Sequence, residues 1–187
     1  MKKQEIAKTI GLLIIFAAIV LFVFFRMTQN ASQRQDKPKE QTELEKLLSY
    51  DFDNEYPKTA RDVMKLYCRY LKAVYSKDTS DEAVGLLNSQ MRRLYAKELL
   101  DYNDESGQLE ALKEERASYK KEKMSLVGYV VAEASQIVYD TIDDVEYARI
   151  RVTLNLKAGA SASKEYTYVL MKDAADCWKV YGWAAEE

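Results

Sequence analysis

Residues 145–157 read VEYARIRVTLNLK, and this stretch decides the fold class of the chain. Apolar and polar side chains alternate with a period of two, which is typical of a strand buried on one face. The apolar face carries Ala148, Ile150, Val152, Leu154 and Leu156. The opposite face carries Arg149, Arg151, Thr153, Asn155 and Lys157. The pattern predicts a half-buried strand whose apolar face covers a core.

Three further strands are expected around this one. Residues 125–140 are rich in β-branched and aromatic side chains, and shorter strands are expected at residues 164–172 and 177–183. Turns at residues 141–144 and 158–163 would join successive strands. Short connections of this kind predict an antiparallel meander of four strands.

Helical periodicity precedes the strands. An apolar stripe predicts a helix over residues 59–76, with Thr59 and Asp62 at its amino-terminal cap. A second helix is expected after Thr79 and Ser80, with Glu82 completing a capping box. Further helical stretches are expected at residues 89–101 and 108–123, separated by a break at residues 103–107. Helices followed by strands predict an α+β domain, with about three helices packed on a curved four-stranded antiparallel sheet.

Near the amino terminus, residues 10–25 form an uncharged apolar run, IGLLIIFAAIVLFVFF. With Thr9 the run spans about 25 Å as a helix, which approaches the hydrocarbon thickness of a bilayer. Lys8 and Arg26 bracket it and can reach the headgroups. The run ends in phenylalanine and arginine rather than in a small-residue cleavage site. We therefore favour a retained transmembrane helix at residues 9–27, in contact with the lipid bilayer, over a cleaved signal peptide.

The remaining chain divides by composition around this span. Residues 1–8 are expected to form a short cytoplasmic tail. Residues 28–57 are expected to form a polar linker that contains a short helix capped by Thr42 and Glu45. Residues 58–187 are expected to form the cone-like α+β domain.

Charge distribution predicts orientation and excludes one class of partner. Residues 1–39 carry seven Lys/Arg against two Asp/Glu, whereas the remainder carries 21 against 28, a net charge of −7. Basic residues next to the membrane favour a cytoplasmic amino terminus with the large domain outside, in a single-pass protein of the cell membrane. A domain with this net charge is poorly suited to phosphate contacts, so no nucleic-acid binding is expected.

Residue usage also restricts the chemistry. The chain has no histidine, which excludes His-dependent triads and His-ligated zinc. Cys68 and Cys177 are too few for a four-thiolate site; they are interpreted as small buried residues, with one disulfide as the alternative. The acidic stretch at residues 51–55 lacks the later Gly and Glu of a calcium loop. No catalytic, metal-binding or cofactor-binding residue is therefore assigned, and no cofactor is expected.

The closing strand at residues 178–183 is aromatic, WKVYGW, and follows three helices and three strands. This architecture resembles the nuclear-transport-factor-two-like cone fold. The stretch YPKTARDV at residues 56–63 is also similar to an uncharacterised membrane-anchored family of Gram-positive bacteria. The resemblance covers roughly residues 50–187. It implies a curved sheet around an interior, but cone folds include enzymes, ligand binders and assembly modules.

Cone-fold isomerases and dehydratases use Asp, Tyr or His for proton transfer in a pocket inside the sheet. A pairing of Tyr67 or Tyr70 with a carboxylate would be needed here, but no motif selects one. We therefore expect a membrane-tethered extracytoplasmic binding or scaffold module rather than an enzyme. Its partners would lie in the cell envelope.

Two alternatives remain: an assembly subunit of a conjugation or type IV secretion-like complex, and a cone-fold enzyme that uses Tyr/Asp chemistry. A deep pocket with a buried carboxylate would favour the enzyme. A filled interior with an exposed apolar patch would favour assembly.

The topology is testable with intact protoplasts. Because the large domain is expected outside, added protease should remove it while the cytoplasmic tail stays protected. Immunoblots against tags at each end measure the outcome. A carboxyl-terminal tag that survives conditions under which known surface proteins are shaved would contradict the orientation.

Overall fold

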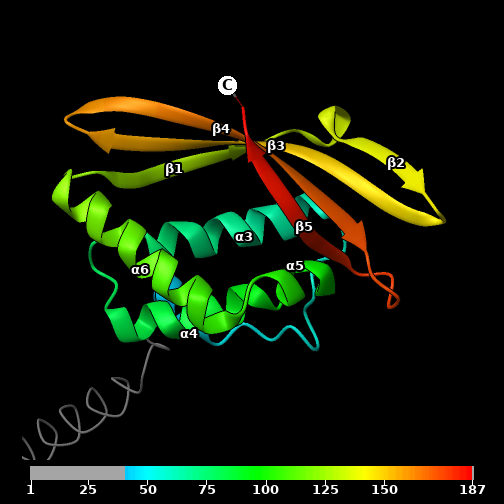
Figure 1. Cartoon of the computed structure of the whole chain (residues 1–187), viewed down its shortest axis with the longest axis horizontal. Helices are drawn as coiled ribbons and strands as arrows, with labels where there is room; N and C mark the ends of the chain where they lie inside the picture. The colour runs from blue at the N-terminus through cyan, green and yellow to red at the C-terminus, as the bar shows by residue number, and fades with distance from the viewer. Residues whose placement is uncertain (1–40, 187) are drawn as a thin grey trace, which may run out of the picture. The chain divides into compact units, whose positions relative to one another are not determined.

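The computed structural model of the chain describes residues 41–186, which form an α+β domain with five α-helices and a curved antiparallel sheet (Figure 1). The helices are α2 (Glu43–Leu48), α3 (Ala60–Val74), α4 (Asp81–Arg92), α5 (Lys97–Tyr102) and α6 (Glu105–Lys121). The strands are β1 (Ser125–Val131), β2 (Val138–Ile142), β3 (Val145–Ala158), β4 (Ala160–Lys172) and β5 (Trp178–Ala185). The expected class, with helices before strands, is confirmed.

The expected tail at residues 1–8, the expected transmembrane helix at residues 9–27 and the linker up to residue 40 lie outside the described residues. Within residues 41–186, no helix combines the length and apolar character needed to cross a membrane. One compact unit begins at Thr42 and includes α2. Leu47 of α2 is fully buried, and its carbonyl accepts a 2.9 Å hydrogen bond from the Tyr70 hydroxyl.

The sheet has the strand order β1-β3-β4-β5, and β2 also pairs with β3. β1 pairs with residues 152–157 of β3 and β2 with residues 145–149, so both lie along the same edge. The expected single strand at residues 125–140 is therefore wrong. Between β1 and β2 the chain leaves the ladder through a short 3-10 helix, η1 (Ala134–Gln136), which a Glu133–Gln136 capping box stabilises. The predicted meander holds only from β2 to β5.

Both hairpin turns are shorter than expected. Asp143 and Asp144 join β2 to β3 with φ angles of 50° and 62°, a two-residue turn that matches the strand twist. Gly159, with φ of 78°, lies alone between β3 and β4. The expected turn at residues 158–163 is mostly strand, because this glycine reverses the chain and its Ala and Ser neighbours continue the ladder.

Helix caps follow the sequence closely at two of three positions. Thr42 and Glu45 form the expected capping box, and the Thr59 hydroxyl accepts from the Asp62 amide at 3.1 Å. The third cap is Ser80, whose hydroxyl accepts from the Ala83 amide at 3.2 Å. The expected capping box with Glu82 is therefore wrong, since α4 begins one residue too late for Glu82 to occupy the third position.

The helical stretch expected at residues 89–101 is divided. α4 continues to Arg92, and α5 begins only at Lys97. Between them the Val180 amide donates to the Leu94 carbonyl and the Ala96 amide donates to the Val180 carbonyl, both at 2.8 Å. This pairing with β5 holds the intervening chain out of the helix. The expected break at residues 103–107 is also shorter, because Asp104 caps α6.

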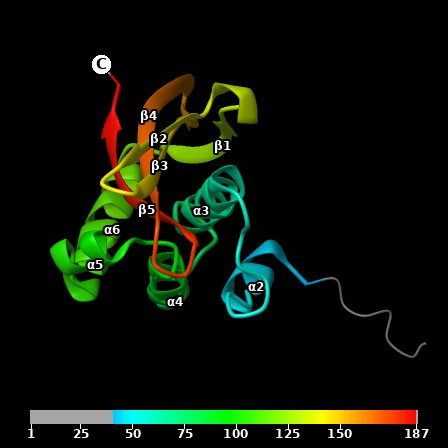
Figure 2. The same cartoon turned by 90° about the vertical axis from the view of Figure 1, so that its right-hand side faces the viewer.

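The core lies between the helices and one face of the sheet. Ala148, Ile150, Val152 and Leu156 of β3 are buried and Leu154 is partly buried, so the predicted alternation is confirmed. α3 packs against β1, β3 and β5 and buries most of its apolar stripe. Helices α2 and α6 lie on opposite sides of α4 (Figure 2).

Helix α6 is held by few groups. Leu112 is its one buried residue within the described part of the chain. The Arg116 guanidinium, 14% exposed, donates to the Val74 carbonyl at the end of α3 and to the Thr79 carbonyl at 2.7 Å. Asp81 lies 3.7 Å from the same guanidinium. Arg116 thus ties α6 to the end of α3 and the start of α4.

Replacing Arg116 by alanine is expected to destabilise the domain by about 2 kcal/mol, because two carbonyls lose charged donors. Lys113→Ala on the exposed side of α6 is the matched control and should change stability by less than about 0.5 kcal/mol. Chemical denaturation of the full chain, followed by circular dichroism, measures both. Equal stability of the two variants would show that Arg116 does not hold α6.

Candidate functional site

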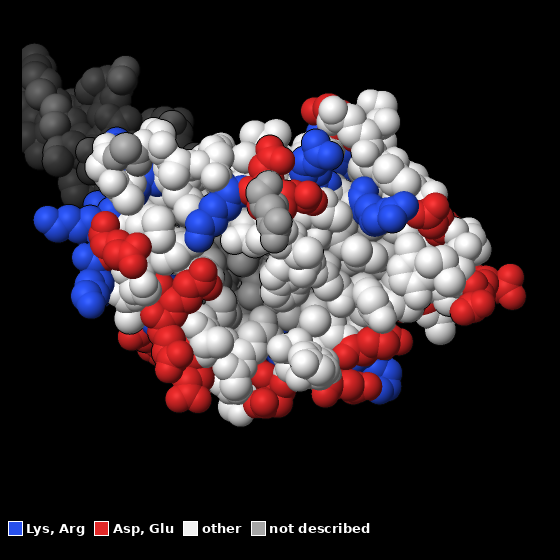
Figure 3. Space-filling view, turned by 45° about the horizontal axis from the view of Figure 1, so that its top comes forward, with Lys and Arg blue, Asp and Glu red and all other residues white. Residues whose placement is uncertain are grey.

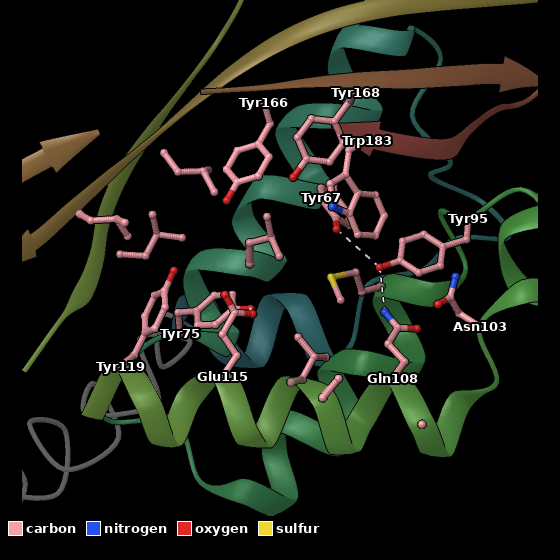
Figure 4. A pocket seen from close by; sticks show the side chains of 18 residues that line it. Tyr67, Tyr75, Tyr95, Asn103, Gln108, Glu115, Tyr119, Tyr166, Tyr168 and Trp183 are labelled. Carbon is pink, nitrogen blue, oxygen red and sulfur yellow. Dashed lines mark hydrogen bonds between the residues drawn. The ribbon is translucent and has the colours of Figure 1, made fainter. Parts of the chain in front are cut away.

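A cavity of about 320 Å³ lies between α3, α6 and the inner face of the sheet (Figure 4). Its lining is contributed by every strand except β2, by α3, α4 and α6, and by the loops on either side of α5. The residues that line it are Tyr67, Leu71, Tyr75, Met91, Tyr95, Asn103, Gly107, Gln108, Ala111, Leu112, Glu115, Tyr119, Leu126, Leu154, Leu156, Tyr166, Tyr168 and Trp183. Figure 3 shows a hollow in this side of the domain, with uncharged atoms forming its floor and charged side chains along part of its edge. The interior is therefore not filled by side chains.

Aromatic rings dominate one end of the cavity. The Tyr168 ring centroid lies 5.5 Å from that of Tyr67 and 5.8 Å from that of Trp183. Tyr95 and Tyr166 extend the cluster, at 6.0 Å from Tyr67 and 6.3 Å from Tyr168 respectively. Trp183 is 45% exposed although its ring belongs to this cluster. The rings form an apolar wall that reaches from buried core to solvent.

A chain of hydrogen bonds fixes the polar groups at this end. The Arg92 guanidinium donates to the Gln108 side-chain oxygen at 2.6 Å, and the Gln108 amide nitrogen donates to the Tyr95 hydroxyl at 2.8 Å. The Tyr95 and Tyr67 hydroxyl oxygens lie 3.5 Å apart, at the long limit of a hydrogen bond. Gln108 is thus oriented from outside the cavity and presents a neutral polar group to it.

The other end of the cavity carries a carboxylate. The Tyr75 hydroxyl donates to Glu115 Oε2, and the Tyr75 ring packs 4.9 Å from that of Tyr119 (Figure 4). Glu115 is exposed, so its carboxylate lies at the rim rather than in the interior. Among the described residues that line the cavity, it is the one formally charged side chain.

The hydroxyls of the tyrosines that line the cavity stay protonated, and therefore neutral, near pH 7. Burial raises the pKa of Tyr119 to about 12, with the charge of Glu115 as the next cause. Burial likewise raises the pKa of Tyr67, Tyr95 and Tyr168, and it raises that of Tyr75 together with its hydrogen bond to Glu115. These hydroxyls are therefore hydrogen-bonding groups and not proton-abstracting bases near pH 7.

Neither tyrosine considered from the sequence lies next to a carboxylate. Tyr67 contacts Tyr95, and Tyr70 donates to a backbone carbonyl away from the cavity. Sequence reasoning missed the pair formed by Tyr75 and Glu115. The available signal was the spacing of Gln108, Leu112, Glu115 and Tyr119, which places two polar groups on the same stripe of α6 as its apolar anchors.

The remaining candidate features are structural. Cys68 is buried, as predicted, whereas Cys177 is half-buried, so the prediction that both are buried is wrong for Cys177. Both are free thiols in the structure, without the alternative disulfide. Burial raises the pKa of Cys68 to about 12. Asp51 accepts hydrogen bonds from the amides of Asp53 and Asn54 and closes its own turn. Within residues 41–186, no group of three or more His, Cys, Asp or Glu side chains is arranged to hold a metal ion.

A family model described as a domain of unknown function, DUF6715, matches residues 1–183. The chain belongs to this family. The matched range contains every residue that lines the cavity, ending at Trp183, and it also contains the apolar run at residues 10–25. A comparison with curated proteins gave no match.

The raised tyrosine pKa values predict the alkaline stability of the domain. In the unfolded chain these hydroxyls ionise near pH 10, whereas in the folded domain they stay protonated to higher pH. The free energy of unfolding should therefore be fully present below about pH 10 and fall as pH rises above it. Urea titrations at several pH values, with tyrosinate absorbance as a second readout, measure this. Full ionisation of the cavity tyrosines near pH 10 in a folded domain would contradict it.

Proposed function

We propose that this chain is a membrane-tethered, non-enzymatic binding module that takes a small, largely apolar molecule into the aromatic cavity. The single observation that carries the proposal is the open, ring-lined interior of about 320 Å³. Ligand pockets are mostly apolar, lie within a few hundred cubic ångströms, and hold a few oriented polar groups. Gln108 and Glu115 are such groups, one at each end.

The geometry favours binding over catalysis. A cone-fold enzyme would need a carboxylate or another base held inside the pocket, but Glu115 is exposed at the rim. The hydroxyls nearest the interior have raised pKa values because of burial, so they remain protonated. The cavity can therefore hold and orient a molecule, while it offers no buried base to abstract a proton.

The membrane anchor and the fold complete the proposal. Residues 9–27 would anchor the chain in the cell membrane, with the amino terminus in the cytoplasm and the domain outside. The family match over residues 1–183 supports treating the apolar run and the domain as one unit. A helix layer under a curved antiparallel sheet, with a cavity between them, supports the resemblance to the nuclear-transport-factor-two-like fold.

An assembly role is the second candidate, and a specific surface favours it. Four exposed apolar side chains lie on β1 and β2, which share one edge of β3: Val127, Val130, Val138 and Ile142. Exposed apolar groups that gather in one region are typical of protein interfaces. This surface is separate from the lining of the cavity, so an envelope partner at this edge is compatible with an occupied cavity.

The binding proposal is tested with the neutral probe 4-phenyl-1-butanol and the full chain in phosphatidylcholine nanodiscs. Ala111 of α6 lines the cavity and is also exposed to solvent, so it lies at the opening. The larger side chain of Ala111→Trp should fill or cover this opening. Ala117→Trp, on the same helix and outside the lining, is the matched control. Isothermal titration calorimetry, with empty nanodiscs subtracted, should give binding to wild type and Ala117→Trp and a loss of at least about tenfold in Ala111→Trp.

Equal affinity in the two tryptophan variants would place the probe elsewhere and contradict the proposal. Absence of binding to wild type and to the control would favour the assembly role instead. Circular dichroism of each variant without probe shows that the fold is retained.

A further inference from the structure

The charged groups of the cavity lining are of one sign, negative. Its 18 residues include one carboxylate, Glu115, and among these described residues there is no Lys, Arg or second acid. Arg92, which contacts Gln108, is used outside the lining to orient that amide and to bind the Asn103 carbonyl. A negatively charged ligand would therefore meet a like charge and no countercharge. A neutral ligand would leave the carboxylate unused.

Glu115 also lacks a basic partner on its own helix. The positions three and four residues away are Leu112, Ala111, Ser118 and Tyr119, so no intrahelical ion pair can form with it. Arg116 points to the carbonyls of Val74 and Thr79 and lies near Asp81 instead. Within residues 41–186, no Lys or Arg forms an ion pair with Glu115. The neutral hydroxyl of Tyr75 donates a hydrogen bond to it.

The rings around Glu115 add to the field that a cation would meet. Tyr75, at the end of α3, and Tyr119 of α6 form a ring pair that lies beside the carboxylate (Figure 4). The face of an aromatic ring attracts an ammonium group within about 6 Å, and the attraction grows when water is partly excluded. Because Glu115 is at the rim, a cation there keeps part of its hydration while an attached apolar body enters the cavity.

We propose that the ligand of this cavity is an amphipathic cation, with an amine or alkylammonium group beside Glu115 and an apolar body among the rings around Trp183 and Tyr168. This inference rests on the proposed binding function and specifies the chemical class of the molecule. The neutral end of the cavity, at Gln108 and Tyr95, would hydrogen-bond a hydroxyl or carbonyl at the far end of such a ligand.

Three probes that share one body and differ in charge test the ligand class: 4-phenylbutylamine, 4-phenyl-1-butanol and 4-phenylbutyrate. Titration calorimetry uses the full chain in phosphatidylcholine nanodiscs, with empty discs subtracted. The amine should bind wild type about tenfold more tightly than the alcohol, and the butyrate should bind more weakly than the alcohol. Glu115→Gln should reduce the affinity for the amine to that for the alcohol.

Glu114→Gln is the matched control, since it removes the same charge from a neighbouring exposed position of α6 that does not line the cavity. It should retain the wild-type preference for the amine. Equal affinity of wild type for amine and alcohol would overturn the ligand class and leave the binding function standing. A preference for the amine that survives in Glu115→Gln would also overturn it. Failure of all three probes to bind would overturn the binding function as well.

Discussion

The contact of the Arg116 side chain with the Val74 and Thr79 carbonyls ties α6, which lines one side of the cavity, to the end of α3 and the start of α4. Among its described residues α6 fully buries Leu112, while Leu109 and Tyr119 are partly buried against the core, so polar contacts add to a limited apolar contact. The largely desolvated Arg116 guanidinium donates hydrogen bonds to two carbonyls, and these bonds stabilise the position of α6 in addition to its limited apolar packing. The hydrogen bonds from Arg92 to Gln108 and from Gln108 to Tyr95 hold the amino-terminal part of the helix, so polar contacts near both ends fix α6 while the space between it and the sheet remains open.

The aromatic lining follows from this incomplete closure. Tyrosines can border an open space because each has an apolar ring for the core and a hydroxyl for a polar neighbour. Tyr67 and Tyr168 place their rings in the core, while Tyr75 uses its hydroxyl to orient Glu115. Burial keeps these hydroxyls protonated, so the cavity presents neutral donors and a single carboxylate. Such a lining is suited to recognition by shape and charge, and none of its described residues is a buried base.

Local sequence signals predicted those parts of the fold that local physics controls. The alternation from Ala148 to Leu156 gave the buried face of β3, and Thr42 and Thr59 gave two helix starts through their own hydroxyls. The predictions from sequence were wrong where contacts with a segment distant in the chain determine the local structure. The chain between α4 and α5 leaves the helix because Leu94 and Ala96 bond to Val180 in β5. The long strand expected after residue 124 is divided because β1 and β2 pair with different halves of β3.

The sequence by itself determined the apolar run at residues 10–25, the absence of histidine and the order of helices before strands. These are properties of composition and short-range periodicity, which need no knowledge of distant contacts. Only the tertiary structure decided which tyrosines border a cavity and that Glu115 lies beside Tyr75, forty residues away in the chain. The sequence does not distinguish Glu115 from the other, solvated glutamates of the same charged helix. Glu115 differs only because the packing of α3, α6 and the sheet puts aromatic rings around it and, among the described lining residues, no cation.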